Sequence, residues 1–383
     1  MPKKPTIDDI ARLAGVSRTT VSRVLNHKSD VDPKTRDHVL RIIKEQNFVP
    51  SATASRLAGG RSSLIGILIP SWAWPLIPDL TRGIVETVKE TAYDLVLYSI
   101  NDEDIERDRS EVINRLLATQ LTAGLLAVFP AHASQHLTQL YKQGFPVVII
   151  DDQEMQTTPW VGTDNTGGAH AAVRHLISLG HRRIAHIQGP SEYLVSKDRY
   201  QGYRQALLEA GITPDPDLVL AGDFMPPSGH ACASKFFELP VEKRPTAIFA
   251  ASDQMAYGVL VAAEEYGLSI PHDIALVGFD DDAPSVHTRP ALTTVRQPLF
   301  EMGQQGIEML LSMLDALQAP ARARWIRSRG NGLTAGTDER RAMSESRLMR
   351  IQLPANLVVR ASCGANYRVS IPAFSDKATL EGN

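Results

Sequence analysis

Residues 6–26 read TIDDIARLAGVSRTTVSRVLN, two short helical patterns separated by a glycine. Apolar residues recur at helical spacing in both halves. Thr6 and Asp9 stand three apart at the start of the first half, close to a capping box with Asp in place of Glu. Gly15 suits a tight turn because glycine accepts a positive φ. This layout predicts a helix-turn-helix, which places its second helix in the DNA major groove.

The second helix of this pattern carries a polar outer face. Ser17 is expected to cap it, and its apolar residues face inward. The side chains left outside suit base edges and phosphates, although a merely solvated face is the alternative for any one of them. A third helix starts at Asp32-Pro33, and a helix N-terminus favours phosphate. The candidate DNA contacts in this head are Thr6, Ser17, Arg18, Thr19, Ser22, Arg23, Asn26 and Thr35.

Residues 50–61 form a short, weakly helical run between Pro50 and the pair Gly59-Gly60. Alone it is too short for a stable helix in water. Arg56 and Leu57 are its candidate DNA contacts, and an exposed leucine there can wedge between base steps in the minor groove. An ordinary flexible linker is the alternative that composition alone allows.

Charge is unevenly distributed along the 383 residues. The first 61 carry 12 Lys and Arg against 6 Asp and Glu, whereas the whole chain has a net charge of −3. A basic head on an acidic body is typical of a DNA reader joined to another domain. Two cysteines without metal-type spacing indicate reduced, buried thiols. The start lacks a signal peptide and no apolar run has the length of a membrane span, so we expect a cytoplasmic, nucleoid-associated protein.

The rest of the chain alternates apolar runs with helical patterns. Such βα alternation with near-continuous apolar strands predicts α/β lobes with parallel sheets and helices on both faces. The series is too long for one sheet and divides near residues 161–165, which predicts two lobes with a cleft between them. The expected strands lie at 64–69, 95–98, 124–129, 147–150, 184–187, 247–250 and 274–278, with a helix at 78–93 and a further strand at 351–360.

These patterns divide the chain into four parts. We expect a DNA-binding domain over 1–49, a hinge over 50–61, a two-lobed effector-binding domain over 62–363, and a tail over 364–383. Lobe 1 is expected at about 62–161 and 292–320, lobe 2 at about 162–291 and 349–363, and a loop insertion of no assigned role at 321–348.

Polar and aromatic side chains follow several of the expected strands. In parallel sheets ligands bind beyond the carboxyl ends of the strands, so these side chains point to one cleft. Carboxylates accept hydrogen bonds from hydroxyl groups and flat rings stack on C–H faces, which suits a polyhydroxylated ligand. A single Asp after a strand is more often a helix cap. The candidates from this argument are Trp72, Trp74, Asp151, Ser191, Phe224, Ser252, Asp253 and Asp280.

Several specific motifs give the chain a resemblance to a known family. The head contains AGVS at 14–17 and TVSRVLN at 20–26, and the hinge ends in LAG at 57–59. The body contains DRYQGY at 198–203, ASDQMA at 251–256, VGFDD at 277–281 and LTTVRQ at 292–297. The chain resembles the lactose/galactose repressor family of bacterial transcription regulators from Thr6 to about Leu317 and again over 351–363.

This resemblance implies a body like a periplasmic sugar-binding protein, which dimerises and whose lobes shift when an effector binds. It places Arg18 and Thr19 at base-reading positions, Arg23 at an arginine that reaches DNA, and Leu57 at the minor-groove wedge. In the cleft it places Arg199, Asp253, Asp280 and Gln297 at effector-contacting positions and Phe224 at a stacking position. Ser252 departs from the family, which often has Asn there, and the segment from Arg322 to Leu348 is longer than the family's connection.

The prediction is therefore a homodimeric repressor that binds a pseudo-palindromic operator and is released by a sugar-type effector between the lobes. One alternative keeps the DNA head and makes the ligand a corepressor or the controller a partner protein. An enzyme is a further alternative, but no GxGxxG, P-loop, GxSxG or HExxH motif is present. Clustered carboxylates are compatible with glycoside hydrolysis, yet no pair is marked out for its two roles. No cofactor, metal or membrane partner is expected.

Overall fold

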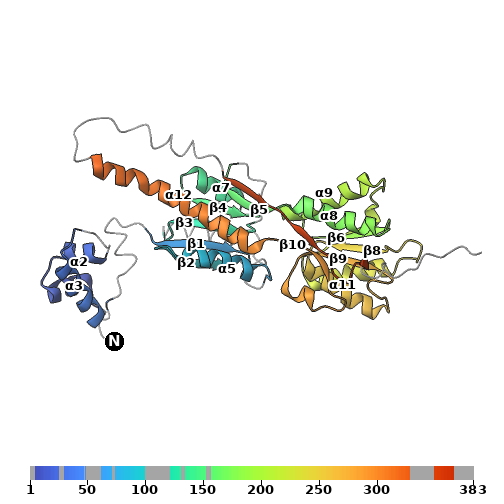
Figure 1. Ribbon diagram of the computed structural model, residues 1–383, viewed down its shortest axis with the longest axis horizontal. Coiled ribbons are helices and arrows are strands. Elements are labelled where there is room, and N and C mark those ends of the chain that lie inside the picture. The colour runs from blue at the N-terminus through green and yellow to red at the C-terminus, as the bar shows by residue number, and fades with distance from the viewer. Residues whose placement is uncertain are drawn as a thin grey trace, which may run out of the picture. The chain divides into compact units, whose positions relative to one another are not determined.

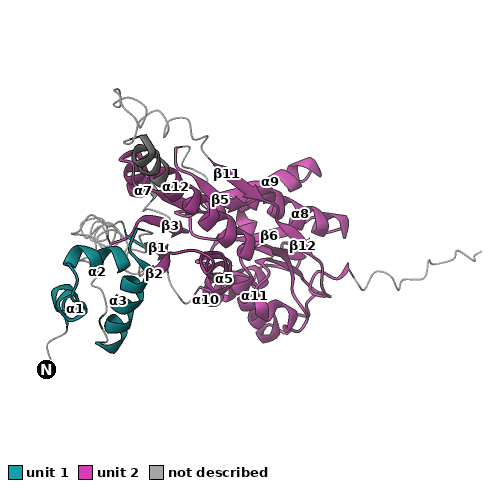
Figure 2. Cartoon of the chain, turned by 60° about the vertical axis from the view of Figure 1, so that its left-hand side comes forward, with its two compact units in different colours: residues 1–63 teal, residues 64–383 magenta. Residues whose placement is uncertain are grey.

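The computed structural model describes residues 5–25, 30–46, 48, 62–70, 74–99, 121–130, 134–151, 157–327 and 349–365. The side chains of 318–327 are outside this description. The chain divides into two compact units, residues 1–63 and 64–383 (Figure 2). Each unit has its own hydrophobic core and is described by itself below.

The first unit is a three-helix head, α1 (Ile7–Ala14), α2 (Arg18–Leu25) and α3 (Pro33–Glu45). The expected capping box is present, since the Thr6 side chain accepts a hydrogen bond from the Asp9 N–H and the Asp9 carboxylate accepts one from the Thr6 N–H. Gly15 follows α1 with φ 63°, the left-handed conformation that the turn requires. Inward-facing side chains of all three helices form one core, which confirms the helix-turn-helix.

The second unit begins with a six-stranded parallel sheet in the order β11-β5-β4-β3-β1-β2 (Figure 1). Two helices, α5 and α12, pack together on one face of this sheet, and α7 packs on the other. We call this sheet and its helices the first lobe. Its elements are β1 (Leu64–Ile69), α5 (Ile77–Val88), β2 (Asp94–Ser99), β3 (Gly124–Val128), α7 (Ser134–Lys142), β4 (Val147–Ile150), β5 (Trp160–Thr163), α12 (Leu299–Arg327) and β11 (Arg350–Leu353).

The second lobe repeats this plan with the sheet order β12-β10-β9-β8-β6-β7, in which only β12 runs antiparallel among the described strands. Helices α8 and α9 cover one face and α10 and α11 the other. Its elements are α8 (Asn165–Ser178), β6 (Ile184–Gln188), α9 (Leu194–Glu209), η2 (Pro216–Leu218), β7 (Val219–Ala221), α10 (Pro226–Phe237), β8 (Ala247–Ala250), α11 (Asp253–Glu265), β9 (Ala275–Asp280), η3 (Ala283–Val286), β10 (Thr293–Arg296) and β12 (Asn356–Val358).

Each sheet reverses its strand order once, between β1 and β3 in the first lobe and between β6 and β8 in the second. Connections leave a sheet in opposite directions at such a point and open a crevice beyond the strand ends. The chain passes between the lobes three times, from β5 to α8, from β10 to α12 and from β11 to β12. The fold therefore places two crevices against each other with three short connections beside them.

The expected lobe boundaries are wrong at two places. Strand β10, expected in lobe 1 as part of 292–320, pairs with β9 in the second lobe, and β11, expected in lobe 2, pairs with β5 in the first. The single strand expected over 351–360 is two strands interrupted at Pro354, because proline has no N–H for a ladder. The chain crosses between the lobes after β10 and again at this proline, so each edge strand completes the sheet it reaches.

The expected loop insertion at 321–348 is also wrong in its first part, because α12 continues to Arg327. Residues 328–348 lie outside the described residues, as do those of the hinge at 50–61 and of the tail from 366 onward. Strands β5, β7 and β10 were missing from the predicted set because they are only 3–4 residues long and two of them contain threonine among their apolar residues.

Candidate functional site

The outer face of α2 carries the candidate base contacts. Val21 and Val24 are buried against the head's core, whereas Arg18, Thr19 and Arg23 are exposed. The Arg18 guanidinium lies 3.8 Å from the Asp8 carboxylate, and both side chains are about two-thirds exposed. A pair this exposed is weak and leaves Arg18 available to another partner. The structure thus presents these three side chains together on one solvent-facing surface.

Several other candidate contacts in the head have partners within it. Ser17 caps α2 by accepting a hydrogen bond from the Thr20 N–H at 3.0 Å. The Asp32 carboxylate accepts hydrogen bonds from both the N–H and the hydroxyl group of Thr35, at 3.0 and 3.3 Å. That carboxylate occupies the place at the start of α3 where a phosphate was expected, so the structure does not offer the Thr35 N–H to DNA.

Arg23 forms an ion pair with Asp30, to which its Nε donates a hydrogen bond at 3.2 Å. Both side chains are about half exposed, so a phosphate can compete for the guanidinium. Ser22 is partly buried and Thr6 is exposed. Asn26, Arg56 and Leu57, three of the candidate DNA contacts, lie outside the described residues.

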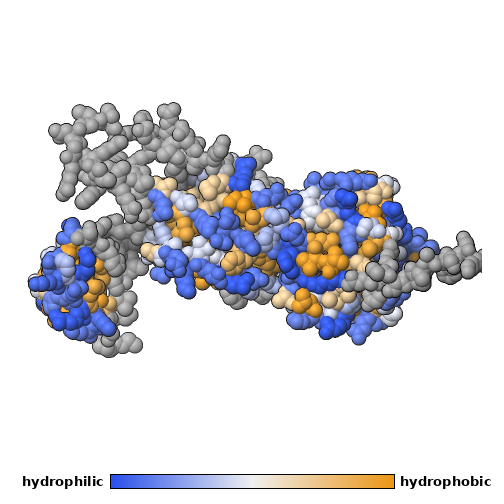
Figure 3. Space-filling view, in the orientation of Figure 1, coloured by the Kyte–Doolittle hydropathy of each residue, from blue (hydrophilic) through white to orange (hydrophobic). Residues whose placement is uncertain are grey.

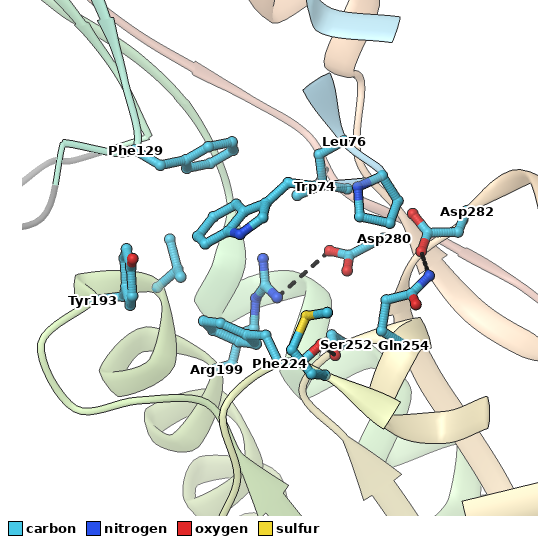
Figure 4. Close-up of a pocket in the computed structure, with 13 residues that line it drawn as sticks. Trp74, Leu76, Phe129, Tyr193, Arg199, Phe224, Ser252, Gln254, Asp280 and Asp282 are labelled. Atoms are coloured by element: carbon cyan, nitrogen blue, oxygen red, sulfur yellow. Dashed lines mark hydrogen bonds and ion pairs between the residues drawn. The ribbon is translucent and has the colours of Figure 1, made fainter. Parts of the chain in front are cut away.

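A pocket lies between the two lobes at the carboxyl ends of their strands (Figure 4). Among the described residues, the first lobe contributes uncharged, largely apolar side chains, from the segment after β1 and from the end of β3. The second lobe contributes aromatic, polar and charged groups. The lining residues are Trp74, Pro75, Leu76 and Phe129 of the first lobe and Tyr193, Val195, Arg199, Phe224, Met225, Ser252, Gln254, Asp280 and Asp282 of the second.

Four aromatic rings form a continuous chain through this pocket. The ring centroids of Phe129 and Trp74 are 6.0 Å apart, those of Trp74 and Tyr193 5.7 Å, and those of Tyr193 and Phe224 5.9 Å. All three distances are typical of contacting rings. Trp74 belongs to the first lobe and Tyr193 to the second, so the middle contact joins the lobes directly.

Arg199 is the charged centre of the pocket and only 3% exposed. Its Nε donates to Asn165 Oδ1 at 2.8 Å, and its Nη1 donates to the Ala251 carbonyl at 2.6 Å and lies 3.5 Å from Asp280 Oδ1. The guanidinium also lies 3.8 Å from the centroid of the Phe279 ring. Burial lowers the pKa of Arg199, and Asp280 opposes this shift. Since these contacts all lie within the second lobe, Arg199 is held in place before any ligand arrives.

Asp280 ends β9 in a strained backbone conformation, with φ 122°, and Asp281 follows with φ 62°. Burial raises the pKa of Asp280 well above its usual value, while the nearby Arg199 acts in the opposite direction. Gln297, at the second connection between the lobes, donates to Asp280 Oδ1 at 2.7 Å. Asp281 faces Arg296 and Arg360, each at 2.6 Å. Asp280 and Asp281 therefore link the end of β9 at the pocket to residues 296–297, near the second connection between the lobes, and to Arg360 after β12.

Positive φ values at non-glycine residues gather at the same strand ends. Within the described ranges such residues are Phe129, Asp151, Phe224, Asp280 and Asp281, which follow or end β3, β4, β7 and β9. Backbone strain of this kind persists where the surrounding structure enforces it, and it concentrates at binding sites. Gly189 leaves room for the Phe224 side chain, because a Cβ at position 189 would overlap the Phe224 ring. The strain is independent support for a functional pocket here.

Asp151 lies behind the lining, near the first connection between the lobes. Its Oδ1 accepts hydrogen bonds from the Thr163 N–H and from Asn165 Nδ2, both at 3.3 Å. Burial raises the pKa of Asp151 to about 6, and Arg199 of the other lobe lowers it. Because Asn165 also accepts from Arg199, the chain Asp151–Asn165–Arg199 carries a polar contact from the first lobe into the second.

The structure separates the predicted effector residues into two groups. Trp74, Arg199, Phe224, Ser252 and Asp280 line the pocket. Asp253 does not, because its carboxylate points into the second lobe and accepts hydrogen bonds from the Asp282 N–H, the Ser285 hydroxyl and the Thr294 hydroxyl at 2.5–2.9 Å. Asp151, Gln297 and the exposed Ser191 are also absent from the lining, and Trp72 lies outside the described residues.

Four important lining residues were missed from the sequence: Phe129, Tyr193, Gln254 and Asp282. Phe129 was counted as the end of the strand expected over 124–129, and Tyr193, five residues after β6, was not singled out. Gln254 and Asp282 each stand one position after a residue that was selected or discussed. Their side chains meet, since Gln254 Nε2 donates to Asp282 Oδ2 at 2.8 Å. A position just beyond the end of a strand was the signal in the sequence that could have identified these residues. Applying it to every polar residue after a strand, and not only to selected ones, would have found Gln254 and Asp282.

The described residues offer no sign of a metal or membrane site. No group of three or more His, Cys, Asp or Glu within them has an arrangement that can hold a metal ion. None of the helices that the structure describes has both the length and the apolar character needed to span a bilayer.

A helix-turn-helix head followed by two parallel-sheet lobes with a pocket between them is the architecture of a DNA-binding transcription regulator. Residues 6–51 match the family model described as bacterial regulatory proteins, lacI family, and residues 173–329 match the periplasmic binding protein-like domain. The chain belongs to the lacI family. This places it among transcription regulators and not among enzymes.

Individual relatives agree over most of the chain. Catabolite control protein A of Priestia megaterium is 33% identical over 81% of this chain and 92% of its own, and the transcriptional regulator CelR of Thermobifida fusca is 34% identical over 82% and 92%. Among solved structures, the lac repressor dimer bound to operator and the anti-inducer ONPF has a TM-score of 0.76 at 28% identity, covering 94% of this chain and 99% of that one. A CelR–cellobiose complex has a TM-score of 0.64 at 31% identity with the same coverage.

Proposed function

We propose that this regulator is a repressor whose hold on its operator is released when a sugar binds in the pocket between the lobes. The observation that carries the proposal is the pocket's divided lining, in which Trp74 of one lobe contacts Tyr193 of the other. A ligand that contacts both walls has a different affinity for each lobe arrangement, and only such a difference can shift the balance between them.

The pocket's size supports a change of shape on binding. The pocket is partly open, and its volume of about 50 Å³ holds a few water molecules, less than a sugar ring needs. A sugar must therefore separate some of the four rings, and the contact between Trp74 and Tyr193 is the one that ties the lobes together. Flat rings stack on the C–H faces of a sugar, and carboxylates accept hydrogen bonds from its hydroxyl groups.

On the DNA side, the exposed face of α2 supports direct base reading by Arg18 and Thr19. In this proposal Arg23 exchanges Asp30 for a phosphate, and Leu57 of the hinge wedges into the minor groove. Replacing Arg18 with Ala is expected to weaken operator binding by about 1–3 kcal/mol, roughly 5- to 150-fold, because a base contact is lost. Arg12→Ala, which changes an even more exposed arginine on α1, is the control, and an equal loss in both variants would contradict the assignment.

We also propose that the protein acts in the cytoplasm as a homodimer, which suits a pseudo-palindromic operator. The second lobe has a groove of about 580 Å³ beside α11, lined mostly by apolar residues together with Glu264, Arg289 and the hydroxyl groups of Tyr257, Ser269 and Thr288. Val261 and Val286 nearby are about half exposed, and Figure 3 shows apolar side chains gathered on a face of this lobe. When such a surface meets a second copy of itself, its opposite charges can pair across the two-fold axis.

Sedimentation tests the dimer. Val261→Asp is expected to convert dimers to monomers at micromolar concentration, because it buries a charge in the interface. Val241→Asp alters an even more exposed valine at the turn between α10 and β8 and serves as the control. Dimers of unchanged stability in Val261→Asp would remove this groove from the proposal.

The release itself is tested with the full-length protein. An operator is first selected from random duplexes, and its affinity is then measured by fluorescence anisotropy while sugars are added. Cellobiose is the first probe, because a relative is known as a complex with it. We expect operator affinity to fall at least about 10-fold at saturating ligand, the range of an ordinary allosteric coupling. Sugar binding without any change in operator affinity would contradict the proposal.

A corepressor is the second candidate. Relatives 33% identical to this chain include the repressor PurR of Haemophilus influenzae, and the rings of Trp74 and Phe224 can also stack a flat base. The same anisotropy titration with purines separates the two possibilities, since a corepressor raises operator affinity where an inducer lowers it.

A further inference from the structure

The polar end of the pocket is unusually poor in positive charge. Asp280, Asp282, Gln254 and Ser252 lie at this end, opposite Phe129 and Tyr193 (Figure 4). Arg199 is the single cationic residue among the described lining residues, and its charge already faces Asp280.

Of the two carboxylates in the described lining, Asp282 is the one with no ion pair to another described residue. It is 7% exposed, and its side chain accepts one hydrogen bond, from Gln254 Nε2 to Oδ2 at 2.8 Å. The same residue's N–H is fixed by Asp253, which holds the loop after β9 in place. Among the described residues nothing donates to the second oxygen, Oδ1. Burial raises the pKa of Asp282, as expected for a carboxylate that the protein leaves partly unsatisfied.

A carboxylate that lacks donors in the protein is well placed to accept them from a ligand. It gains a hydrogen bond from a hydroxyl group, whereas a phosphate or carboxylate on the ligand brings a second negative charge into a nearly dry site. Like charges in such a position repel each other strongly. With Arg199 engaged by Asp280, no cation in the described lining offsets this repulsion.

We infer that Asp282, positioned by Gln254, is a specificity-determining residue that accepts a hydrogen bond from a hydroxyl group of the effector and excludes anionic ligands. The effector is accordingly an uncharged, hydroxyl-rich molecule and not a phosphorylated sugar. This inference rests on the proposed function, because it concerns the ligand of the same pocket. It extends the proposed function by naming the residue that selects the ligand and the chemical class of ligand that the pocket excludes.

The test compares two ligands that differ by one phosphate, cellobiose and cellobiose 6′-phosphate. Their dissociation constants are measured by calorimetry on the full-length protein and on Asp282→Asn, which keeps an oxygen for Gln254 and removes the charge. Asp217→Asn makes the same chemical change on an exposed position of the same lobe and is the control. The informative quantity is the ratio of the two dissociation constants, because a general loss of folding or of pocket shape affects both.

For the wild type and the control we expect cellobiose to bind at least about 100-fold more tightly than its phosphate. In Asp282→Asn that preference is expected to fall at least about 10-fold, mainly through gained binding of the phosphate. Cellobiose binding with an unchanged preference in Asp282→Asn would overturn the inference alone. Equally tight binding of the phosphate to the wild type would do the same. Failure of both ligands to bind the wild type would contradict the inference together with the sugar proposal.

Discussion

The two lobes share one strand order but present different chemistry to the pocket between them. The second lobe supplies a fixed polar platform, in which Arg199, Asp280 and Gln297 are buried and bonded to one another. The first lobe supplies Trp74, Leu76 and Phe129, side chains without charge. This difference supports the proposal that the second lobe recognises hydroxyl groups in a preformed site and that the first lobe closes over the ligand with apolar surfaces.

The largest effect is expected from breaking the polar platform. Arg199→Met leaves Asp280 buried without its cation, and such a loss costs about 3–5 kcal/mol of unfolding free energy. Urea unfolding measures it, with Arg204→Met on the same helix α9 as the control. If Arg199→Met were as stable as the wild type, the platform would not be a preformed unit of the second lobe.

The next largest effect is a loss of folding stability at acidic pH. His186 in β6 is buried, stacks on Tyr203 and Phe249, and donates from Nδ1 to the Phe249 carbonyl at 2.9 Å. Burial lowers the pKa of His186 from 6.5 to about 4. Because the unfolded chain binds a proton below pH 6.5 and the folded chain only near pH 4, stability is lost as the pH falls through this window.

The loss from His186 amounts to about 2 kcal/mol between pH 7 and pH 5. His186→Asn, which can still donate to the Phe249 carbonyl, is expected to remove this part of the pH dependence. Unfolding free energies of both proteins at the two pH values give the answer. Identical pH dependence in the two would show that the buried imidazole is not the acid-sensitive group.

In the first lobe, Trp74 provides the sharpest test of the closing role. Trp74→Leu is expected to weaken sugar binding by roughly 10- to 100-fold, the usual effect of removing a central aromatic contact. Trp160→Leu changes a half-buried tryptophan of the same lobe that packs in a different cluster and serves as the control. Unchanged sugar affinity in Trp74→Leu, measured by calorimetry, would assign the whole of recognition to the second lobe.

The smallest effect is expected at Asp151, whose pKa burial raises to about 6. The folded chain binds its proton more readily than the unfolded chain, so this group favours folding as the pH falls from 7 to 5, by about 1 kcal/mol. Its sign is opposite to that of His186. At pH 7, Asp151→Asn is therefore expected to be as stable as the wild type or slightly more stable. Between pH 7 and pH 5 the variant lacks the increase in stability that protonation of Asp151 gives the wild type, and thermal unfolding at both pH values measures the difference.

Much of this site follows from strand ends, and the exceptions have physical causes. Trp74, Ser252 and Asp280 were found because they lie in the segments that follow apolar runs, and Phe224 because it lies in a further loop. Asp253 was placed in the cleft by the same reasoning, yet it starts α11 and turns inward to bond the loop after β9. The direction of a side chain at a strand end depends on backbone angles that residue order does not reveal.

The assignment of edge strands shows a similar limit. β11 falls in the run expected as a strand over 351–360, whereas β10 was not expected, but for both the lobe depends on which sheet edge is free to pair. That is a property of the whole fold. Phe129 and Tyr193 were overlooked for a related reason, since an aromatic residue near a strand reads as core unless a facing lobe is known.

Reciprocity between the two ligands offers the most direct test of the central claim that pocket and operator are coupled. Cellobiose affinity is measured on the full-length protein with and without saturating operator DNA, beside the operator affinity with and without saturating cellobiose. If one equilibrium links the sites, DNA weakens sugar binding by the same factor by which sugar weakens DNA binding. Sugar affinity that is identical on free and operator-bound protein would contradict the account.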